Sequence, residues 1–375
     1  MKSIQMVDLA TQYHRLKADI DAAMNEVIVR SQFIQGDAVR EFEQGLSKKL
    51  EVPFVWGCGN GTDALQMAFM ALDLNPGDEV IVPSFNYIAA AEAAALMGLH
   101  PVFVDVDEHT FCIDPVSAEH AITTKTKAIV AVHLFGQCAP MEQLMNLCKK
   151  HQLFLIEDTA QAIGAQYLFS DGRTMYAGTM GDVGTLSFFP SKNLGCYGDG
   201  GAVLTRNEGL AERLKMIRNH GQKVKYTHEI IGINSRLDTL QAAILGVKLN
   251  HLDSFTRARQ DLAKAYSEAF SKISGLIPPV ISAQSTHVFH QYTLRCTAGN
   301  RQALADFLKL KGIPCMIYYP IALHLQPVFA AVHGNLSLPI SSQLCDEVIS
   351  LPMHTEMTAD QQEYIIHTVQ EFFHG

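Results

Sequence analysis

The sequence predicts an α/β fold, in which a mostly parallel central sheet is covered by helices on both faces and joined to a smaller C-terminal α/β domain. Two observations carry this prediction. Short apolar runs alternate with helical patterns from about residue 50 to 205, which is the rhythm of strand–helix–strand units. From Ser235 onward the pattern changes to long amphipathic helices, followed by a second and shorter α/β region.

Five short apolar runs are the expected strands of the central sheet. They cover residues 79–82, 101–105, 128–132, 153–156 and 201–204. Helical patterns over residues 88–97 and 141–150 lie between them and can cover a parallel sheet. Because ligands of such sheets bind at the carboxyl ends of the strands, polar residues that follow these runs are candidates for a site.

The second half of the chain is expected to begin with a long helix. Ser235-Arg-Leu-Asp238 has the form of a capping box for a helix that runs to about Asn250. The later elements are a helix over residues 255–273, a strand over 291–295 and a helix over 301–311. We therefore expect a large domain with an N-terminal helical segment over residues 1–250 and a small C-terminal domain over 251–375.

Composition narrows the classes of function. The 375-residue chain has a net charge of −9 and a pI near 5.9, so no basic surface for nucleic acid or acidic membranes is expected. No uninterrupted apolar run of the kind found in signal peptides or membrane helices occurs in the first 21 residues, which favours a cytoplasmic location. The eight scattered cysteines predict reduced thiols and no metal site.

One lysine stands in an informative context. Lys192 lies between an apolar strand and a glycine-rich turn, within Ser187-Phe-Phe-Pro-Ser-Lys192. Partial desolvation there would lower the pKa of the amine, giving the neutral form that attacks an aldehyde and later a base that moves a proton between carbons. Taken alone, an ordinary surface lysine is the favoured interpretation, because most lysines are exposed.

An acidic pair ends a buried strand upstream, in Leu155-Ile-Glu-Asp-Thr-Ala-Gln161. This position places Asp158 at the edge of the sheet that faces a ligand. The cofactor pyridoxal 5'-phosphate (PLP) needs a carboxylate against its pyridine nitrogen, which keeps the ring protonated and able to accept electrons. Gln161 could bond the ring hydroxyl of that cofactor. Read alone, Asp158 would suit a helix cap equally well.

A glycine-rich turn, Gly57-Cys-Gly-Asn-Gly-Thr-Asp-Ala-Leu65, runs directly into a helical pattern. The early N–H groups of such a helix can bind a phosphate. The dinucleotide fingerprint G-x-G-x-x-G fails here, because Thr62 stands where its last glycine is required. Gly61 and Thr62, with the hydroxyl of Ser187, are therefore our candidates for holding the cofactor phosphate.

Six motifs spread over nearly the whole chain occur together. They are Asn60–Leu65, Pro83–Tyr87, Glu157–Gln161, Ser187–Lys192, Asn219–Gly221 and Asn234–Gln241. In combination they resemble the sugar aminotransferases of the DegT/DnrJ/StrS group, PLP-dependent enzymes with the aspartate aminotransferase fold (fold type I). The resemblance implies a three-layer PLP-transferase fold and is closest to aminotransferases that act at C-3 of a ketosugar.

The resemblance implies a role in cofactor binding for each matching residue. Lys192 would be the catalytic residue and hold PLP as a Schiff base, Asp158 would contact the ring nitrogen and Gln161 the ring oxygen. Tyr87 would stack on the ring, whereas the alternative for Tyr87 is plain core packing. The phosphate would be held by Gly61, Thr62 and Ser187.

The resemblance also implies a homodimer with shared active sites. Asn234 would reach the cofactor phosphate of the partner, and Arg236 would lie near the partner's substrate site. The alternative for Asn234 is a residue at the start of a helix. His133, which follows a predicted strand in Val132-His-Leu-Phe-Gly136, is expected to be structural.

The expected reaction transfers an amino group from L-glutamate to a nucleotide-linked ketosugar, for amino-sugar biosynthesis in a lipopolysaccharide O-antigen or a glycosylated natural product. Some relatives are dehydratases in which a histidine replaces the lysine, and the presence of Lys192 favours simple aminotransfer. Two different functions would suit the same fold: transfer by PLP to another small molecule, and noncatalytic sensing of a ligand. The combination of Lys192, Asp158 and Gln161 favours an enzyme.

The segment Ile317-Tyr-Tyr-Pro-Ile-Ala-Leu-His-Leu-Gln-Pro327 resembles the substrate-side motif of the family, in which His-Tyr-Pro is frequent. Tyr319 and His324 match, but Tyr318 replaces the histidine. A neutral phenol offers a sugar carboxylate no charge-assisted contact, so a dTDP-linked 3-keto-6-deoxyhexose is expected in preference to a UDP-linked 3-keto uronic acid. Alternatively, Tyr318 and Tyr319 alternate in and out along a strand.

Overall fold

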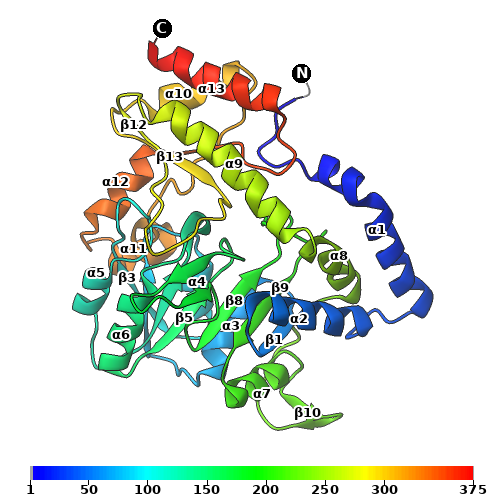
Figure 1. Cartoon of the computed structure of the whole chain (residues 1–375). Coiled ribbons are helices and arrows are strands. Elements are labelled where there is room, and N and C mark those ends of the chain that lie inside the picture. The colour runs from blue at the N-terminus through cyan, green and yellow to red at the C-terminus, as the bar shows by residue number, and fades with distance from the viewer. Residues whose placement is uncertain (1–2, 375) are drawn as a thin grey trace.

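The structure is a computed structural model that describes residues 3–374. A twisted central sheet has helices on both sides, and a smaller region built from the C-terminal part of the chain lies against one end of it (Figure 1). Helix α1 (Leu9–Arg30) projects at the flank of the molecule, beside α2 (Asp37–Leu50). Between residues 3 and 374, no helix combines the length and the apolar character needed to cross a bilayer.

The central sheet has seven strands in the order β1-β9-β8-β5-β4-β2-β3. These strands are β1 (Phe54–Cys58), β2 (Glu79–Pro83), β3 (His100–Val104), β4 (Thr126–Val132), β5 (Phe154–Asp158), β8 (Val183–Ser187) and β9 (Gly201–Thr205). Strand β9 pairs antiparallel with both β1 and β8, and all other pairs are parallel, so the predicted, mostly parallel sheet is confirmed. The five predicted strands are present, and β1 completes one edge.

Both faces of this sheet are buried. Along β9, Ala202 and Leu204 pack into a cluster with α2 and α8 (Thr239–Leu249), whereas Val203 packs into the opposite cluster with α3 and α7. This alternation follows from the two-residue period of a strand. The helices that join the strands are α3 (Gly61–Ala71), α4 (Ala89–Leu96), α5 (Pro115–His120) and α6 (Met141–His151), and α7 (Glu208–Ile217) follows the last strand.

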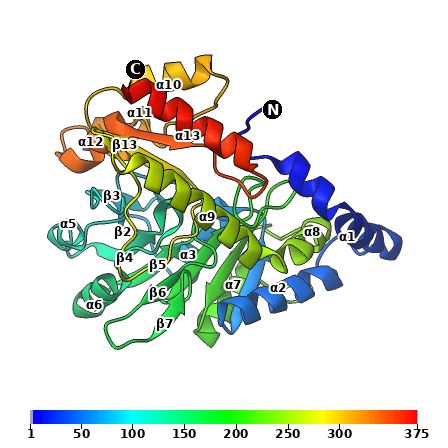
Figure 2. The same ribbon diagram turned by 45° about the horizontal axis from the view of Figure 1, so that its top comes forward.

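The C-terminal region has a core of its own around an antiparallel sheet of order β12-β13-β14. Its elements are α9 (Leu252–Phe270), β12 (Leu276–Ile277), β13 (Tyr292–Cys296), α10 (Arg301–Leu310), α11 (Pro327–His333), α12 (Pro339–Glu347), β14 (Val348–Leu351) and α13 (Ala359–His374). Helix α9 runs diagonally from this region toward α8 in both views (Figures 1 and 2). The expected division near residue 250 falls between these two helices and stays a prediction.

The N-terminal segment lies against the C-terminal region. Ile4 belongs to the same apolar cluster as Tyr266 and Leu294, and the backbone N–H of Met353 donates to the carbonyl of Met6 at 3.3 Å. The first described residues of the chain therefore pack against the C-terminal region.

The predicted capping box at the start of α8 is wrong. The helix begins at Thr239, and its N-cap Asp238 makes no side-chain hydrogen bond to the first turn. The Ser235 hydroxyl instead donates to Asp63 Oδ2 at 2.6 Å and accepts from the N–H of Gly59 at 2.9 Å. The Ser235 hydroxyl, which the local pattern predicted to cap the helix, is thus used in a tertiary contact with the glycine-rich turn.

Two short hairpins lie outside the two larger sheets. The hairpins are β6 (Gln166–Leu168) with β7 (Thr174–Tyr176), and β10 (Gln222–Val224) with β11 (Thr227–His228). All eight cysteines are free, in agreement with the expected reduced thiols.

Candidate active site

Lys192 lies in the loop that follows β8, at the carboxyl end of the sheet. Its backbone N–H donates to the carbonyl of Phe189 at 2.8 Å, which fixes a turn in front of the side chain. The loop is tightly folded: a Cβ on Gly195 would lie 2.3 Å from the carbonyl oxygen of Pro190. Only glycine permits this approach.

Asp158 ends β5, the strand parallel to β8, and is 8% exposed. Burial raises the pKa of its carboxyl, opposed by the N–H of Ala160, 3.1 Å from Oδ1, and by the positive charge of Lys192. Burial likewise lowers the pKa of Lys192 to about 8, opposed by Asp158. The structure therefore brings together the two residues that the sequence singled out.

Gln161 connects this pair to the segment that was expected to face the substrate. Its Oε1 accepts from the N–H of Phe135 at 2.7 Å, and its Nε2 donates to the hydroxyl of Tyr319 at 3.0 Å. The ring of Tyr87 lies 6.2 Å from that of Tyr319 and is 57% exposed. Plain core packing of Tyr87 is therefore wrong, and its ring is open to a ligand.

Helix α3 begins beside the same loop. Asn60 caps it, with Oδ1 accepting from the N–H of Asp63 at 2.8 Å, and neither the cap nor the helix supplies an acceptor for the N–H groups of Gly61 and Thr62. A Cβ on Gly61 would lie 2.8 Å from Cβ of Ser187. The three candidates for phosphate binding thus come together at a helix N-terminus, which favours an anion.

Two further polar residues flank Lys192 and were missed in the sequence. His290 is buried, with no partner for Nδ1 among residues 3–374, and burial together with the charges of Lys192 and Arg259 holds its pKa well below the usual range. Asn193 donates to the carbonyl of Val288 at 2.9 Å, and its Oδ1 has no partner in the same part of the chain. His290 comes from the C-terminal region, and nothing in its local sequence indicates that contact.

His133 is structural, as expected. Its Nδ1 accepts from the N–H of Ala139 at 2.9 Å, so Nε2 carries the proton that it shares with Glu157 at 2.9 Å. Glu157 is fully buried and also accepts from three backbone N–H groups, those of Gly178, Met180 and Gly181. This network fixes the turn before β8 and orients the end of β5.

The segment with Tyr318 and Tyr319 is not a strand, so their alternation along a strand is wrong. The two rings lie 5.9 Å apart, and both are half-buried. His324 is 1% exposed, and its Nδ1 lies 2.7 Å from the hydroxyl of Ser84. This contact ties the segment to the Pro83–Tyr87 motif, while the small exposed surface of the ring leaves little for a substrate to contact.

Asn234 and Arg236 lie before α8, near the β10–β11 hairpin. Asn234 is exposed and forms a backbone bridge with Asn219, whose Oδ1 accepts from Nη1 of Arg236 at 3.3 Å. These contacts join the Asn219–Gly221 motif to the Asn234–Gln241 motif. Neither side chain contacts Lys192 of its own chain through any described hydrogen bond.

The model of the DegT/DnrJ/EryC1/StrS aminotransferase family matches residues 14–370. The chain belongs to this family. A Geobacillus stearothermophilus relative, "Pleiotropic regulatory protein", is 45% identical and covers 99% of each chain. The UDP-2-acetamido-2-deoxy-3-oxo-D-glucuronate aminotransferase of Pseudomonas aeruginosa is 42% identical, covering 94% of this chain and 95% of its own. The dTDP-3-amino-3,4,6-trideoxy-alpha-D-glucose transaminase of Streptomyces venezuelae is 40% identical, covering 98% and 96%.

Solved structures of family members have the same fold. The crystal structure of S. venezuelae DesV in complex with a ketimine intermediate superposes with a TM-score of 0.96 at 38% identity, covering 100% of both chains. That of NtdA from Bacillus subtilis with bound cofactor PMP gives a TM-score of 0.89 at 32% identity, covering 96% of this chain and 82% of that one. The predicted family, fold and aminotransferase class are confirmed.

Aminotransferases of this family depend on PLP, and the residues of this site fit that cofactor. The buried carboxylate of Asp158 suits a positively charged ring nitrogen, because such a partner offsets the desolvation that raises its pKa. The N–H groups of Gly61 and Thr62 at the start of α3, for which the helix itself supplies no acceptor, suit a phosphate. Lys192 interacts electrostatically with Asp158, and burial makes its amine easier to deprotonate.

Proposed function

We propose that the chain transfers an amino group from L-glutamate to the C-3 ketone of a nucleotide-linked sugar. The observation that carries the proposal is the pairing of the half-buried Lys192 with the buried Asp158, beside Gln161 and the N-terminus of α3. A sensor that only bound a ligand would not need a lysine with a depressed pKa next to a buried carboxylate. Perturbed titratable groups in a site support chemistry there.

The geometry and the family resemblance together support a set of residues that would hold PLP. The helix terminus with Gly61, Thr62 and Ser187 would hold the phosphate, Asp158 the ring nitrogen and Gln161 the ring oxygen. When bound, PLP supplies a carbonyl group that exchanges amines and a ring that accepts electrons.

Lys192 supplies the proton transfers. Its pKa of about 8 means that Nζ is partly neutral at neutral pH, so it can take a proton from carbon and return it to another atom. The Phe189 turn and the close Gly195 backbone orient the amine. Tyr319, whose hydroxyl accepts a hydrogen bond from Gln161, keeps its own proton because burial raises the pKa of that hydroxyl. It can therefore orient the Gln161 amide without becoming a competing anion.

The sugar substrate is proposed to be a dTDP-linked 3-keto-6-deoxyhexose. Relatives at similar identity are named for both a UDP-linked uronate and a dTDP-linked deoxy sugar, so overall similarity does not decide between them. Tyr318 does favour one of them: its half-buried phenol, kept neutral because burial raises its pKa, suits a methyl group better than a carboxylate.

The homodimer with shared sites is part of the proposal. Exposed apolar side chains gather at the end of α1 and the segment after it, and others lie on and after the β10–β11 hairpin. They are Ile28, Val29, Phe33 and Ile34 in the first group and Val224, Tyr226 and Ile231 in the second. The backbone bridge between Ile34 and Asp238 places the first group beside the start of α8. A second copy on this surface would lie next to Asn234 and Arg236.

A regulatory role is the second candidate, because one relative at 45% identity is named as a regulatory protein. A single experiment separates the two functions. The PLP-loaded protein is given L-glutamate and a panel of UDP- and dTDP-linked 3-ketosugars, and the products are identified by mass spectrometry. An amino sugar with 2-oxoglutarate as co-product supports the proposal. Ligand binding without turnover of any panel member would overturn it in favour of the sensor.

A further inference from the structure

A buried lysine outside the active site has no part in the chemistry described above. Lys248 lies on α8 and is 1% exposed. Burial lowers its pKa to about 8. Burying an amine costs free energy unless its hydrogen atoms find partners, so the contacts of this side chain show what it does in the fold.

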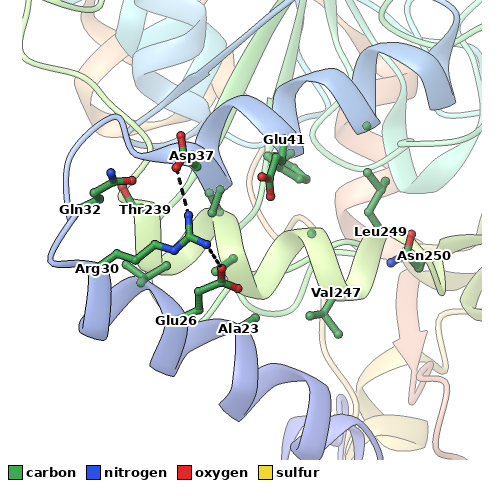
Figure 3. A pocket seen from close by; sticks show the side chains of 17 residues that line it. Ala23, Glu26, Arg30, Gln32, Asp37, Glu41, Thr239, Val247, Leu249 and Asn250 are labelled. Carbon is green, nitrogen blue, oxygen red and sulfur yellow. Dashed lines mark hydrogen bonds and ion pairs between the residues drawn. The ribbon is translucent and has the colours of Figure 1, made fainter.

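Lys248 lies on the face of α8 that contacts the loop after Lys192. A cavity of about 390 Å³ lies between α8 and the helices α1 and α2, and Thr239, Val247 and the C-cap residue Asn250 are among the residues that line it (Figure 3). Lys248 is not among the lining residues. It shares its own face with Gln241, because seven residues make two helical turns.

Both side chains of this face hold the loop that follows Lys192. Nζ of Lys248 donates to the carbonyl of Gly195 at 2.7 Å and lies 4.3 Å from the centre of the Tyr197 ring, a cation–π distance. Gln241 accepts from the N–H of Tyr197 at 2.8 Å and donates to its carbonyl at 3.2 Å. Four contacts from one helix thus fix Gly195 and Tyr197.

The position of this segment is transmitted to Lys192 through the backbone. Gly195 packs directly on the carbonyl of Pro190, and the N–H of Lys192 donates to the carbonyl of Phe189. A shift of Gly195 would therefore disturb the turn that orients the Lys192 amine beside Asp158.

We propose that Lys248 is a positioning residue, whose ammonium group holds the Gly195–Tyr197 segment so that Lys192 keeps its place in the active site. The inference rests on the proposed catalytic role of Lys192. Apart from Gly195 and Tyr197, Lys248 has no described hydrogen bond or ring contact. An apolar side chain of similar length could fill the space but would lose both contacts.

The test compares Lys248→Met with Lys248→Arg in cofactor-free and PLP-loaded protein. Hydrogen exchange in the cofactor-free protein reports the loop directly and needs no catalytic activity. In Lys248→Met we expect exchange in residues 193–199 to accelerate about tenfold, the scale of one hydrogen bond to a charged group, with the central sheet unchanged. Lys248→Arg keeps a cation and should restore most of the protection.

Kinetics of the loaded enzyme give the second measurement. Because a misplaced reacting group costs turnover more than substrate binding, we expect Lys248→Met to lower kcat about tenfold or more while KM for the sugar nucleotide stays within about twofold. The matched control is Lys215→Met, which removes an exposed lysine whose Nζ lies 5.4 Å from the centre of the Trp56 ring. It should change neither the exchange of residues 193–199 nor kcat.

Three outcomes decide the proposal. Unchanged exchange in the loop, or acceleration spread evenly over the whole chain, would overturn it whatever the enzyme's activity. If Lys248→Met does not fold, Tyr197→Leu removes the ring that contacts both Lys248 and Tyr13. It must then accelerate exchange in the same loop more than Tyr13→Leu does for the proposal to stand. In the third outcome, the unaltered protein lacks aminotransferase activity while Lys248→Met still loosens the loop. That result would refute the proposed function and leave the structural role of Lys248 intact.

Discussion

Lys192 and Asp158 each shift the pKa of the other, and each shift is opposite in direction to the effect of burial on that group. Burial favours the neutral form of both groups, whereas the charge of each favours the ionised form of the other. The balance leaves Lys192 with a pKa of about 8, compared with the ordinary value of 10.5. The amine is therefore deprotonated far more often than that of a surface lysine.

Uptake of PLP by the cofactor-free protein should depend on this balance. The neutral amine is the attacking form, so the initial rate of covalent incorporation should rise with pH and level off above about 8. Asp158→Asn removes the charge that raises the Lys192 pKa, so the midpoint should move to lower pH, although the cofactor is bound more weakly. Stopped-flow absorbance across a pH series measures both effects. A midpoint of the pH profile near 10, or a shift of that midpoint to higher pH in Asp158→Asn, would contradict the coupling between Asp158 and Lys192. The control is Asp171→Asn, which changes an exposed carboxylate.

Removing the Tyr319 hydroxyl should weaken the site by a measurable but small factor. In Tyr319→Phe, Nε2 of Gln161 loses its acceptor, and a hydrogen bond of this kind contributes about 1 kcal/mol. We expect kcat/KM to fall about fivefold. Tyr364→Phe is the matched control, because its hydroxyl donates to the carbonyl of Lys311, a residue that no proposed site includes. Equal losses in the two variants would show that Tyr319 has no special role.

Tyr318 should influence the choice of sugar. Tyr318→His restores the residue that is frequent in the family motif and adds a group that can donate a charge-assisted hydrogen bond to a carboxylate. The ratio of kcat/KM for the UDP-linked 3-keto uronic acid to that for the dTDP-linked 3-keto-6-deoxyhexose should rise about tenfold. Tyr318→Phe, which adds no donor, should leave the ratio nearly unchanged. If the unaltered protein prefers the uronic acid by about tenfold, the argument from Tyr318 is wrong.

Shared active sites predict complementation between two inactive chains. Lys192→Ala lacks the catalytic amine, and Asn234→Ala lacks the side chain proposed to reach the partner's cofactor. Heterodimers of the two would contain one intact site, so mixing after mild dissociation should restore part of the activity. The control mixes each variant with itself. Activity no greater than the sum of the two variants would argue that each chain builds its site alone.

Much of the fold follows from local patterns in the sequence. The apolar runs that became β2, β3, β4, β5 and β9 are recognisable because strands buried on both faces are continuously apolar. The glycine-rich turn before α3 and the carboxylate at the end of β5 are likewise recognisable in the local sequence, and the roles proposed for them rest on these patterns. The Lys192–Asp158 pairing follows from placing two carboxyl ends of neighbouring strands side by side.

Other features depend on contacts between distant segments. Ser235 has the spacing of a capping residue, yet its hydroxyl contacts Asp63. His290 reaches Lys192 only because the C-terminal region folds over the sheet. Lys248 reads as an ordinary residue near a helix end, and its burial against Gly195 is visible only in three dimensions. Such contacts have no local signature, because they are set by how whole elements pack.

The central claim is that the cofactor is held by Lys192, and borohydride reduction followed by peptide mapping tests it most directly. The PLP-loaded protein is reduced and digested, and the peptide that carries the added cofactor mass is sequenced by mass spectrometry. We expect a single modified residue, Lys192, and no modified peptide from Lys192→Ala. A modification on another lysine such as Lys248, or one that persists in Lys192→Ala, would contradict it.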